Sequence, residues 1–420
     1  MKLDKKLQVG LIGLGGRGKS LTETMAQMDQ AQIAMVADVY PDRVRDSQDQ
    51  IEKLSGFRPK GTTDYRQLLA EPSLDCVVIA TSWNTHTNVT KDALRSGKYV
   101  GLEVGGAYDL EDCWELVRLQ EETGTKLMML ENCCYGEREM AVLNMVKKCM
   151  LGRIVHCQGG YQHDLRGEIT TGRENRHYRF QNFLHRNGEL YPTHELGPIA
   201  NILNLNRGNR MVSLCSMSSS ALGLQAWIDE RAPSDSDLRS FHFTQGDVTT
   251  TMIKCAHGET ILLIHDVSLP RPYSRASRIQ GTGGIYMEDN NSIFLWDNVK
   301  DHCSGDPEEE HNWEPFDPYL EKYGHPLWKQ YKASGIKKGH GGIDYLVLSA
   351  FFESVERDSE PPIDVYDAAS WMAITCLSEQ SIAMGSHPVA IPDFTRGRWI
   401  NERPGPKSIY ALDAVYDDLF

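Results

Sequence analysis

The first 130 residues alternate short apolar runs with longer stretches of mixed polar and apolar residues. The apolar runs have the length of buried strands, whereas the stretches between them have the spacing of amphipathic helices. Two of the helices are predicted to stop at Gly97 and Gly124, because glycine favours the left-handed conformation that ends a helix. The predicted strands are 9–12, 33–37, 74–80, 99–103 and 126–130, and the predicted helices are 43–54, 88–96 and 110–123.

The character of the chain changes after about residue 136, where longer strand-like runs begin. Such runs, separated by long insertions, suit an open and mainly antiparallel sheet. We therefore predict an α/β protein with an N-terminal Rossmann dinucleotide-binding domain at 1–135 and a C-terminal α/β substrate domain at 136–420. The predicted strands are 154–162, 212–218, 249–255, 260–267, 277–281 and 284–288, the predicted helices are 142–150, 344–356 and 365–384, and 301–324 is predicted to be a loop.

A glycine-rich turn, GLGGRG at 13–18, follows the first apolar run directly. Glycines at this spacing permit a tight turn, a close approach of backbone to a pyrophosphate, and packing of the following helix. Asp38 follows the second run, 20 residues beyond Gly18, where a carboxylate accepts hydrogen bonds from ribose hydroxyls and repels a 2′-phosphate. The pattern predicts bound NAD rather than NADP, with Gly16, Arg17 and Asp38 in the site.

The composition argues against several classes of binding partner. The 420 residues carry a formal net charge of −14, which argues against nucleic acid and against an anionic membrane surface as partners. The ten cysteines show no metal-ligand spacing, so no metal is expected. No run has the length of a membrane span, and no apolar stretch precedes the first strand. We expect a cytoplasmic protein, unless a signal segment has been removed.

Further motifs resemble the glucose-fructose oxidoreductase/inositol dehydrogenase (Gfo/Idh/MocA) superfamily. They are the glycine turn, WNTH at 83–86, GKYVGLE at 97–103, IDVYDAA at 363–369 and IPDF at 391–394. Dehydrogenases of that superfamily have a Glu-Lys-Pro triplet whose lysine lies close to the reacting carbon. The triplet here is Glu103-Val104-Gly105, and valine can neither donate a proton nor polarise a hydroxyl. This difference argues against an ordinary net dehydrogenase.

Two segments, NGELYPTHELGP at 187–198 and HGGID at 340–344, resemble glycoside hydrolase family 109. These are NAD-dependent glycosidases typified by α-N-acetylgalactosaminidase, and Glu-Val in place of Glu-Lys also matches them. Glu195 departs from the family pattern, where glycine is expected, and adds a carboxylate that can alter the sugar accepted. The other family elements present are Glu131-Asn132, Tyr161, Arg179 and Arg271-Pro272-Tyr273-Ser274.

The resemblance implies that NAD stays bound and is used transiently. NAD oxidises the sugar at C3, a base removes the acidified C2 proton, the glycosidic oxygen leaves C1, water adds, and the C3 ketone is reduced again. Such an enzyme does not need the usual pair of opposed carboxylates.

The resemblance also implies roles for individual residues. His194 is the candidate base at the 3-hydroxyl, since histidine exchanges protons near neutral pH. Tyr161 is the candidate base at C2, provided that a neighbouring cation activates it. Arg179 offers a planar fork of donors to the sugar, and Tyr273 closes the sugar pocket. Tyr191 is expected to contact both the sugar and the cofactor. The remaining cofactor residues expected are Trp83, His86, Glu103, Val104 and Asn132.

The leading hypothesis is therefore an NAD-dependent glycosidase that acts on α-N-acetylgalactosaminides. One alternative is an NAD-dependent sugar or polyol dehydrogenase in which His194 replaces the missing lysine. A second alternative is a non-catalytic dinucleotide sensor, which the complete set of sugar-site residues argues against. By analogy with the superfamily, a homo-oligomer formed through the open sheet is expected.

Overall fold

The computed structural model describes residues 6–298, 312–335 and 339–420. The chain divides into two compact units, each built from segments far apart in the sequence. The first unit comprises Met1–Tyr135, Gln330–Ser370 and Pro404–Phe420, and the second comprises Gly136–Lys329 and Trp371–Arg403. The predicted domains, 1–135 and 136–420, instead divided the chain at a single point. The difference arises because the 14-residue helix α14 (Ile343–Glu356) packs with the N-terminal segment.

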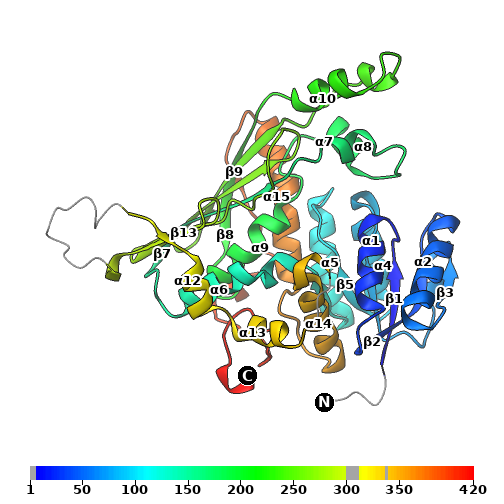
Figure 1. Cartoon of the computed structure of the whole chain (residues 1–420), viewed down its shortest axis with the longest axis horizontal. Helices are drawn as coiled ribbons and strands as arrows, with labels where there is room; N and C mark the ends of the chain where they lie inside the picture. Colours follow the sequence, from blue (N-terminus) through cyan, green and yellow to red (C-terminus); the bar gives the residue numbers. More distant parts are fainter. Residues whose placement is uncertain (1–5, 299–311, 336–338) are drawn as a thin grey trace. The chain divides into compact units, whose positions relative to one another are not determined.

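The first unit contains a six-stranded parallel sheet with the order β3-β2-β1-β4-β5-β6 (Figure 1). This is the Rossmann order, in which a dinucleotide binds where the order reverses, outside the ends of β1 and β4. The predicted fold class is confirmed for this unit. Its strands are β1 (Leu7–Ile12), β2 (Ala31–Ala37), β3 (Lys60–Thr62), β4 (Cys76–Ile79), β5 (Tyr99–Leu102) and β6 (Leu127–Met129). Its other elements are α1 (Gly16–Met25), α2 (Pro41–Ser55), α3 (Tyr65–Leu69), α4 (Trp83–Arg95), α5 (Leu110–Thr123), η1 (Asn132–Tyr135), η4 (His340–Gly342), α14 and η6 (Asp417–Leu419).

The glycine turn after β1 has no room for side chains at two of its glycines. Gly13 has a φ of 92°, and a Cβ there would lie 2.5 Å from the carbonyl oxygen of Ala80. A Cβ on Gly18 would lie 2.0 Å from the carbonyl oxygen of Gly13, so α1 packs directly against the turn. A Cβ on Gly16, in contrast, would meet nothing within 4 Å. Packing therefore requires glycine at 13 and 18, while Gly16 leaves open space at the start of α1.

The second unit contains a nine-stranded sheet with the order β14-β13-β12-β11-β7-β10-β9-β8-β15. Among the strands described, β7 and β10 pair in parallel and the remaining neighbours are antiparallel, which confirms the predicted mainly antiparallel sheet. The strands are β7 (Ile154–Gln162), β8 (Met211–Ser218), β9 (Val248–Cys255), β10 (Thr260–Asp266), β11 (Arg278–Gly281), β12 (Gly284–Met287), β13 (Ser292–Leu295), β14 (Glu314–Pro315) and β15 (Val389–Ala390).

Helices cover one face of this sheet, and the alternation of side chains along β9 shows the difference between the faces. Thr249, Thr251 and Ile253 are buried, whereas Met252 between them is 43% exposed. Helix α9 packs so closely on β7 that a Cβ on Gly159 would lie 2.5 Å from a backbone oxygen of α9. The helical elements are α6 (Glu137–Lys147), α7 (Arg166–Thr170), α8 (Arg179–His185), α9 (Pro192–Ile202), α10 (Gly223–Arg231), η2 (Asp237–Ser240), η3 (Trp296–Asn298), α12 (Asp317–Tyr323) and η5 (Arg398–Ile400). Helices α13 (Pro326–Ala333) and α15 (Val365–Ala383) have residues in both units.

Three predicted elements need correction. The loop expected over 301–324 is wrong for its last part, because α12 forms a helix with Pro318 in the first turn, where the missing N–H costs nothing. Residues 299–311 lie outside the described part of the chain. The helix expected at 88–96 begins earlier, at Trp83, since polar residues of its first turn masked the helical pattern. The helix expected at 142–150 instead spans Glu137–Lys147.

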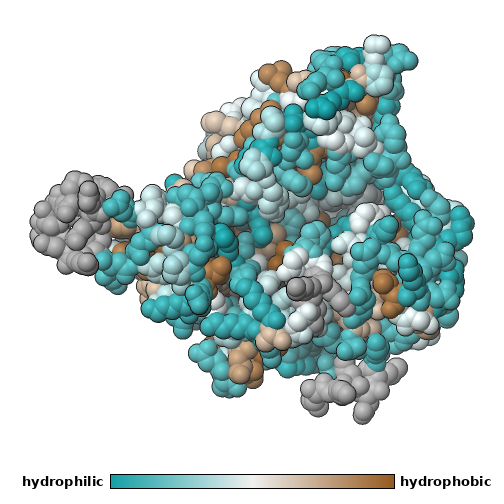
Figure 2. Space-filling view, in the orientation of Figure 1, coloured by the Kyte–Doolittle hydropathy of each residue, from teal (hydrophilic) through white to brown (hydrophobic). Residues whose placement is uncertain are grey.

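The visible surface is mostly hydrophilic, with hydrophobic residues in small separate patches (Figure 2). This distribution agrees with the formal net charge of −14. In the ranges that the structure describes, we find no helix with the length and apolar character needed to cross a membrane.

The glycine turn generates a stability prediction. Gly18→Ala is expected to lower the stability of the protein by about 1–3 kcal/mol, because its methyl group would overlap the backbone at Gly13. Gly16→Ala is the matched control, since open space surrounds that position and its stability should stay near that of the original protein. Thermal unfolding of both variants without added cofactor tests the prediction. Equal melting temperatures for the two variants would contradict it.

Candidate active site

The start of α1 has the features of a pyrophosphate site. Gly15 is the N-cap residue and offers no side chain to the first N–H groups of the helix, and the first turn holds no acidic residue. Free N–H groups and the positive end of the helix dipole favour an anion at this place. The open space beside Gly16 leaves room for it. The turn and the helix therefore fit the phosphates of a dinucleotide.

Asp38 stands at the end of β2, as a ribose-binding carboxylate should. One of its oxygens accepts a hydrogen bond from the N–H of Leu14 at 2.7 Å, and the other accepts from the N–H of Tyr40 at 2.9 Å. Because a carboxylate has about four acceptor positions, capacity remains for ribose hydroxyls. The guanidinium of Arg43 lies 3.8 Å from the same carboxylate.

Arg17 connects the glycine turn to residues that follow two other strands. Its guanidinium forms an ion pair with Glu103, after β5, at 2.9 Å, and with the buried Asp344 of α14 at 2.8 Å. The amide nitrogen of Asn132, after β6, donates to the same Asp344 at 2.7 Å. Arg17, Glu103 and Asn132 were each predicted to contact the cofactor. The structure brings the three together through Asp344.

Three more predicted cofactor residues form the wall next to Glu103. The imidazole Nε2 of His86 lies 2.5 Å from the carbonyl oxygen of Glu103, and burial lowers the pKa of His86 to about 4. His86 is therefore neutral at pH 7, and its Nε2 pairs with a backbone carbonyl rather than with a charged side chain. Trp83 and Val104 are buried, and a Cβ on Gly105 would lie 2.8 Å from the indole ring of Trp83.

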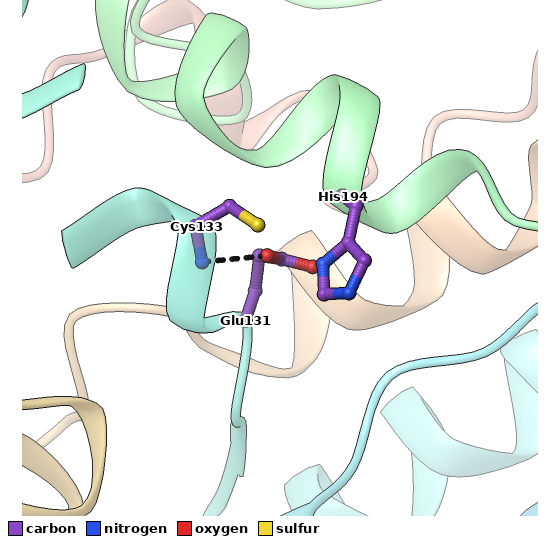
Figure 3. Close-up of side chains that lie close together, drawn as sticks. All are labelled: Glu131, Cys133 and His194. Carbon is purple, nitrogen blue, oxygen red and sulfur yellow. Dashed lines mark hydrogen bonds between the residues drawn. The ribbon is translucent and has the colours of Figure 1, made fainter. Parts of the chain in front are cut away.

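The backbone turn that carries Asn132 is held by its neighbours. The carboxylate of Glu131 accepts a hydrogen bond of 2.9 Å from the N–H of Cys133 (Figure 3). Glu131 is fully buried, so this bond satisfies one acceptor that water cannot reach.

In the second unit, three of the predicted sugar-site side chains form a cluster of rings. Tyr161 lies near the end of β7, and Tyr191 is the N-cap residue of α9. His194, drawn in Figure 3, lies in the first turn of α9. The ring centroids of Tyr161 and Tyr191 are 4.6 Å apart, those of Tyr191 and His194 are 4.8 Å apart, and those of Tyr161 and His194 are 5.6 Å apart. Both tyrosines are more than nine-tenths buried, whereas His194 is partly exposed.

Arg179, the first residue of α8, supplies the cation beside these rings. Its guanidinium carbon lies 5.1 Å from the ring centroid of Tyr191 and 5.8 Å from that of Tyr161. Glu168 of α7 pairs with it at 2.8 Å. A cation at this distance is what a tyrosine requires if it is to act as a base.

Tyr273 is the outermost of the predicted sugar-site residues and is 50% exposed. Its ring contacts His163 with the centroids 5.3 Å apart. The loop that carries it is tied to the end of β7, because Gln162 and Ser274 exchange backbone hydrogen bonds of 2.9 and 3.1 Å. The structure therefore brings Tyr273 to the side of the cluster of rings.

Two buried carboxyl groups lie beneath the cluster. Glu189 and Glu195 are both at most 2% exposed, and each is among the causes that shift the pKa of the other. Burial raises the pKa of Glu189 to about 8, and burial together with the charge of Glu189 raises the pKa of Glu195 well above its ordinary value. Glu195 faces the backbone N–H groups of Tyr161 and Ile264, so it lies between helix and sheet.

Another buried group near the cluster is His265 of β10. Its ring stacks toward that of Tyr161 with 6.4 Å between centroids. Burial and the nearby Arg179 lower the pKa of His265 to about 3, so its ring is neutral.

A Rossmann unit with an open glycine turn and an acidic residue after β2, together with a cluster of tyrosine, histidine and arginine, defines an NAD-binding enzyme. Comparison with protein families agrees with this class: the oxidoreductase family with an NAD-binding Rossmann fold matches residues 7–131, and the glycosyl hydrolase 109 C-terminal domain matches residues 135–401. The chain belongs to glycoside hydrolase family 109 and is an NAD-dependent glycosidase.

The similarity to individual relatives extends over nearly the whole chain. The α-N-acetylgalactosaminidase of Tannerella forsythia is 37% identical over 426 residues, which cover 96% of this chain and 89% of that protein. The α-N-acetylgalactosaminidase of Shewanella oneidensis is 36% identical over 405 residues, with 95% and 87% covered.

Solved structures share the fold at low identity. Levoglucosan dehydrogenase in complex with NADH and levoglucosan is 18% identical with a TM-score of 0.68, and the match covers 92% of this chain and 100% of that one. An oxidoreductase from Agrobacterium radiobacter in complex with NAD+, L-tartaric acid and magnesium is 17% identical with a TM-score of 0.64, covering 92% and 99%. At this identity the likeness shows the fold alone.

The sequence did not indicate the parts played by three side chains. Asp344 stood within the recognised HGGID segment, but no pattern linked it to Arg17, 327 residues away. Glu189 stood within the other recognised segment and read as an ordinary polar residue. His265 lies on the buried side of β10 together with Ile261 and Leu263, and only the structure shows that it is buried beside Arg179.

The buried carboxyl pair generates a pH prediction. Because its pKa values are raised in the folded state, the folded protein binds more protons than the unfolded chain between about pH 5 and 8, and stability falls as the pH rises through this range. Glu195→Gln should reduce this loss of stability between about pH 5 and 8 by on the order of 1–3 kcal/mol. The measurement is the melting temperature against pH. Glu230→Gln, at an exposed position of α10, is the control and should behave like the original protein. Equal pH slopes for Glu195→Gln and the control would contradict the prediction.

Proposed function

We propose that this enzyme hydrolyses α-N-acetylgalactosaminides by transient oxidation of the sugar at C3, followed by elimination and addition of water. The observation that carries the proposal is the cluster of Tyr161, Arg179, Tyr191 and His194 in the second unit. The names of the two α-N-acetylgalactosaminidase relatives support the choice of sugar.

NAD, when bound, would supply the oxidising equivalent at C3 and regain it at the end of each turnover. Asp38, the glycine turn and the wall of Trp83, His86 and Val104 would hold it. Because Val104 replaces the lysine of related dehydrogenases, a different side chain must take the proton of the 3-hydroxyl. His194 is our candidate for this base, since it is partly exposed and its ring is oriented by Tyr191.

Once C3 is a ketone, the proton on C2 becomes acidic, and Tyr161 is our candidate for the base that removes it. Arg179 lies beside the Tyr161 ring and stabilises negative charge on the phenol oxygen. Loss of the C2 proton forms the C1–C2 double bond and breaks the bond between C1 and the glycosidic oxygen, which leaves with a proton. Water then adds at C1 and a proton returns to C2, and hydrolysis is complete once the C3 ketone has been reduced back to the alcohol.

Binding of the sugar is assigned to the same side chains. The guanidinium of Arg179 offers donors in a plane, which suits an acetamido carbonyl or a pair of hydroxyls. Tyr191 contacts the sugar and, by our proposal, the cofactor as well. Tyr273, on its tethered loop at the outer side, covers the sugar.

A second candidate function is a sugar or polyol dehydrogenase. It is favoured by the fold of levoglucosan dehydrogenase, which covers 92% of this chain. The two functions differ in whether NADH accumulates, because a glycosidase of the proposed kind returns its reducing equivalent in every turnover.

A homo-oligomer is proposed from the uncovered face of the nine-stranded sheet. Met217 of β8 is 61% exposed there, and Met252 of β9 is 43% exposed.

The proposed function predicts that a chromogenic aryl α-N-acetylgalactosaminide releases its phenol without net accumulation of NADH. The measurement follows phenol release and absorbance of NADH in parallel, over a panel of α- and β-linked aryl glycosides. Free N-acetylgalactosamine and free polyols with added NAD are the controls. Steady NADH formation from the free sugars, with no phenol released from any glycoside, would establish the dehydrogenase instead.

The same reaction run in deuterium oxide separates elimination from direct displacement. Elimination through C2 introduces solvent deuterium at C2 of the product, whereas displacement at C1 leaves C2 unlabelled. Phenol release with unlabelled product would overturn the proposed route while leaving the glycosidase activity in place.

His194→Ala is expected to lower kcat by about 10²–10⁴-fold, since it removes the base at the 3-hydroxyl. The variant should still retain NAD, because the cofactor residues of the first unit are unchanged. The measurements are kcat and the ratio of bound NAD to protein after gel filtration. His242→Ala, an exposed histidine of the same unit, is the control. Loss of NAD from His194→Ala would assign this residue to the cofactor instead.

A further inference from the structure

The recognised segment 340–344 has no role in the reaction described above, yet it ends in a side chain that accepts four hydrogen bonds. Asp344 is fully buried in the first turn of α14. One of its oxygens accepts from Arg17 at 2.9 Å and from Asn132 at 2.7 Å. The other accepts from Arg17 at 2.8 Å and from Nδ1 of His340 at 2.6 Å. We call Arg17, Glu103, Asn132, His340 and Asp344 the Asp344 cluster.

Four donors saturate the acceptor capacity of a carboxylate. Asp344 therefore has no bond left for solvent or ligand, and its role is to fix the side chains around it. Arg17 needs such a partner, because the first turn of a helix carries a partial positive charge that disfavours a cation. Its bidentate bond to Asp344 and its ion pair with Glu103 offset this charge.

The backbone before α14 is shaped to bring His340 back onto Asp344. His340, Gly341 and Gly342 have φ values of 42°, 71° and 113°, so three successive residues are in the left-handed region. A Cβ on Gly342 would lie 2.5 Å from the ring of Tyr331, which leaves only glycine there. This turn costs conformational energy, and in return it places an imidazole over a buried carboxylate.

The residues that the Asp344 cluster holds are those that border the dinucleotide site. Arg17 follows the glycine turn and belongs to the first turn of α1. Glu103 follows β5 and Asn132 follows β6, at the carboxyl ends of the strands where Rossmann folds bind their ligands.

We propose that His340 and Asp344 are positioning residues that slow the release of NAD, by clamping Arg17, Glu103 and Asn132 around its site. The proposal rests on NAD binding and not on the sugar chemistry, so it can fail or hold independently of the proposed function.

The Asp344 cluster includes one titratable side chain that is largely exposed, that of His340. The hydrogen bond to Asp344 raises the pKa of His340, against the opposing effects of burial and Arg17, and Glu103 adds to the rise. Burial alone would raise the pKa of Asp344, but its bonds from His340 and Arg17 lower it far below its ordinary value. The charged or titratable side chains that face His340 are Asp344, Arg17 and Glu103, and Tyr331 packs on the neighbouring Gly342.

Protonation of His340 changes the charge near the pyrophosphate. With His340 protonated, its charge and that of Arg17 balance those of Asp344 and Glu103. When His340 loses its proton, the cluster carries one net negative charge, which repels the negatively charged pyrophosphate. NAD should therefore be held more tightly below the raised pKa of His340 and less tightly above it.

The test measures the rate of NAD release from the holoenzyme after dilution into NAD-free buffer, at pH 6.5 and at pH 9. The original protein should release NAD at least three times faster at pH 9. His340→Asn, which stays neutral and tolerates a positive φ, should release NAD at least three times faster than the original at pH 6.5 and show little pH dependence. Asp344→Asn should release it at least ten times faster at both pH values.

Two control variants are matched to these changes. His242→Asn replaces an exposed histidine of the second unit, and Asp109→Asn replaces the N-cap residue of α5 in the first unit. Both should retain the release rate and pH dependence of the original protein. If Asp344→Asn does not fold, as judged by circular dichroism, His340→Asn decides the question, because that side chain is 59% exposed and its loss does not disturb the core. Release from His340→Asn at the original rate, with the original pH dependence, would overturn the proposal.

Discussion

A guanidinium group removed from water must be surrounded by acceptors or aromatic faces, and each unit of this protein is organised around one such group. In the first unit, Arg17 is held by Asp344 and Glu103 at 2.8–2.9 Å. In the second unit, Arg179 lies between an ion pair with Glu168 and the rings of Tyr161 and Tyr191. Removing one of these carboxylates leaves its arginine with less compensation for its charge, which lowers stability. Both sets of functional residues are therefore held in place by the need to pair a charge.

The two arrangements serve different tasks. Arg17 is paired with two carboxylates, which balance its charge, and it links residues that border the dinucleotide site. Arg179 is bordered by neutral rings and by a single, partly exposed carboxylate, so its charge still acts on its surroundings. A positive charge beside a tyrosine favours the ionised phenol, which is what removal of a carbon-bound proton demands. The replacement of lysine by Val104 fits this division, since the mechanism that we propose assigns the acid–base chemistry to side chains of the second unit.

Glu195 stands where glycine was expected from the family resemblance, and the structure changes the interpretation of this carboxylate. From the sequence it was expected to add a carboxylate beside the site. The structure places it beneath the cluster of rings, buried together with Glu189. Because burial raises the pKa of both groups, the two carboxyls are held in their protonated, neutral form at neutral pH rather than carrying two charges. The pair lies next to the backbone of Tyr161 and at the start of α9, which are the elements that carry the cluster of rings.

The sequence by itself determined the parallel sheet, the glycine turn, Asp38 and the segments typical of the family. These features are encoded within a few neighbouring residues, as an apolar run, a glycine that must have no side chain, or an acid after a strand. Only the tertiary structure decided that Asp344 binds Arg17 across 327 residues, that Glu189 and Glu195 share one buried site, and that 317–323 is a helix. Pairing of buried charges depends on which distant segments meet, and no local pattern of polar and apolar positions records that.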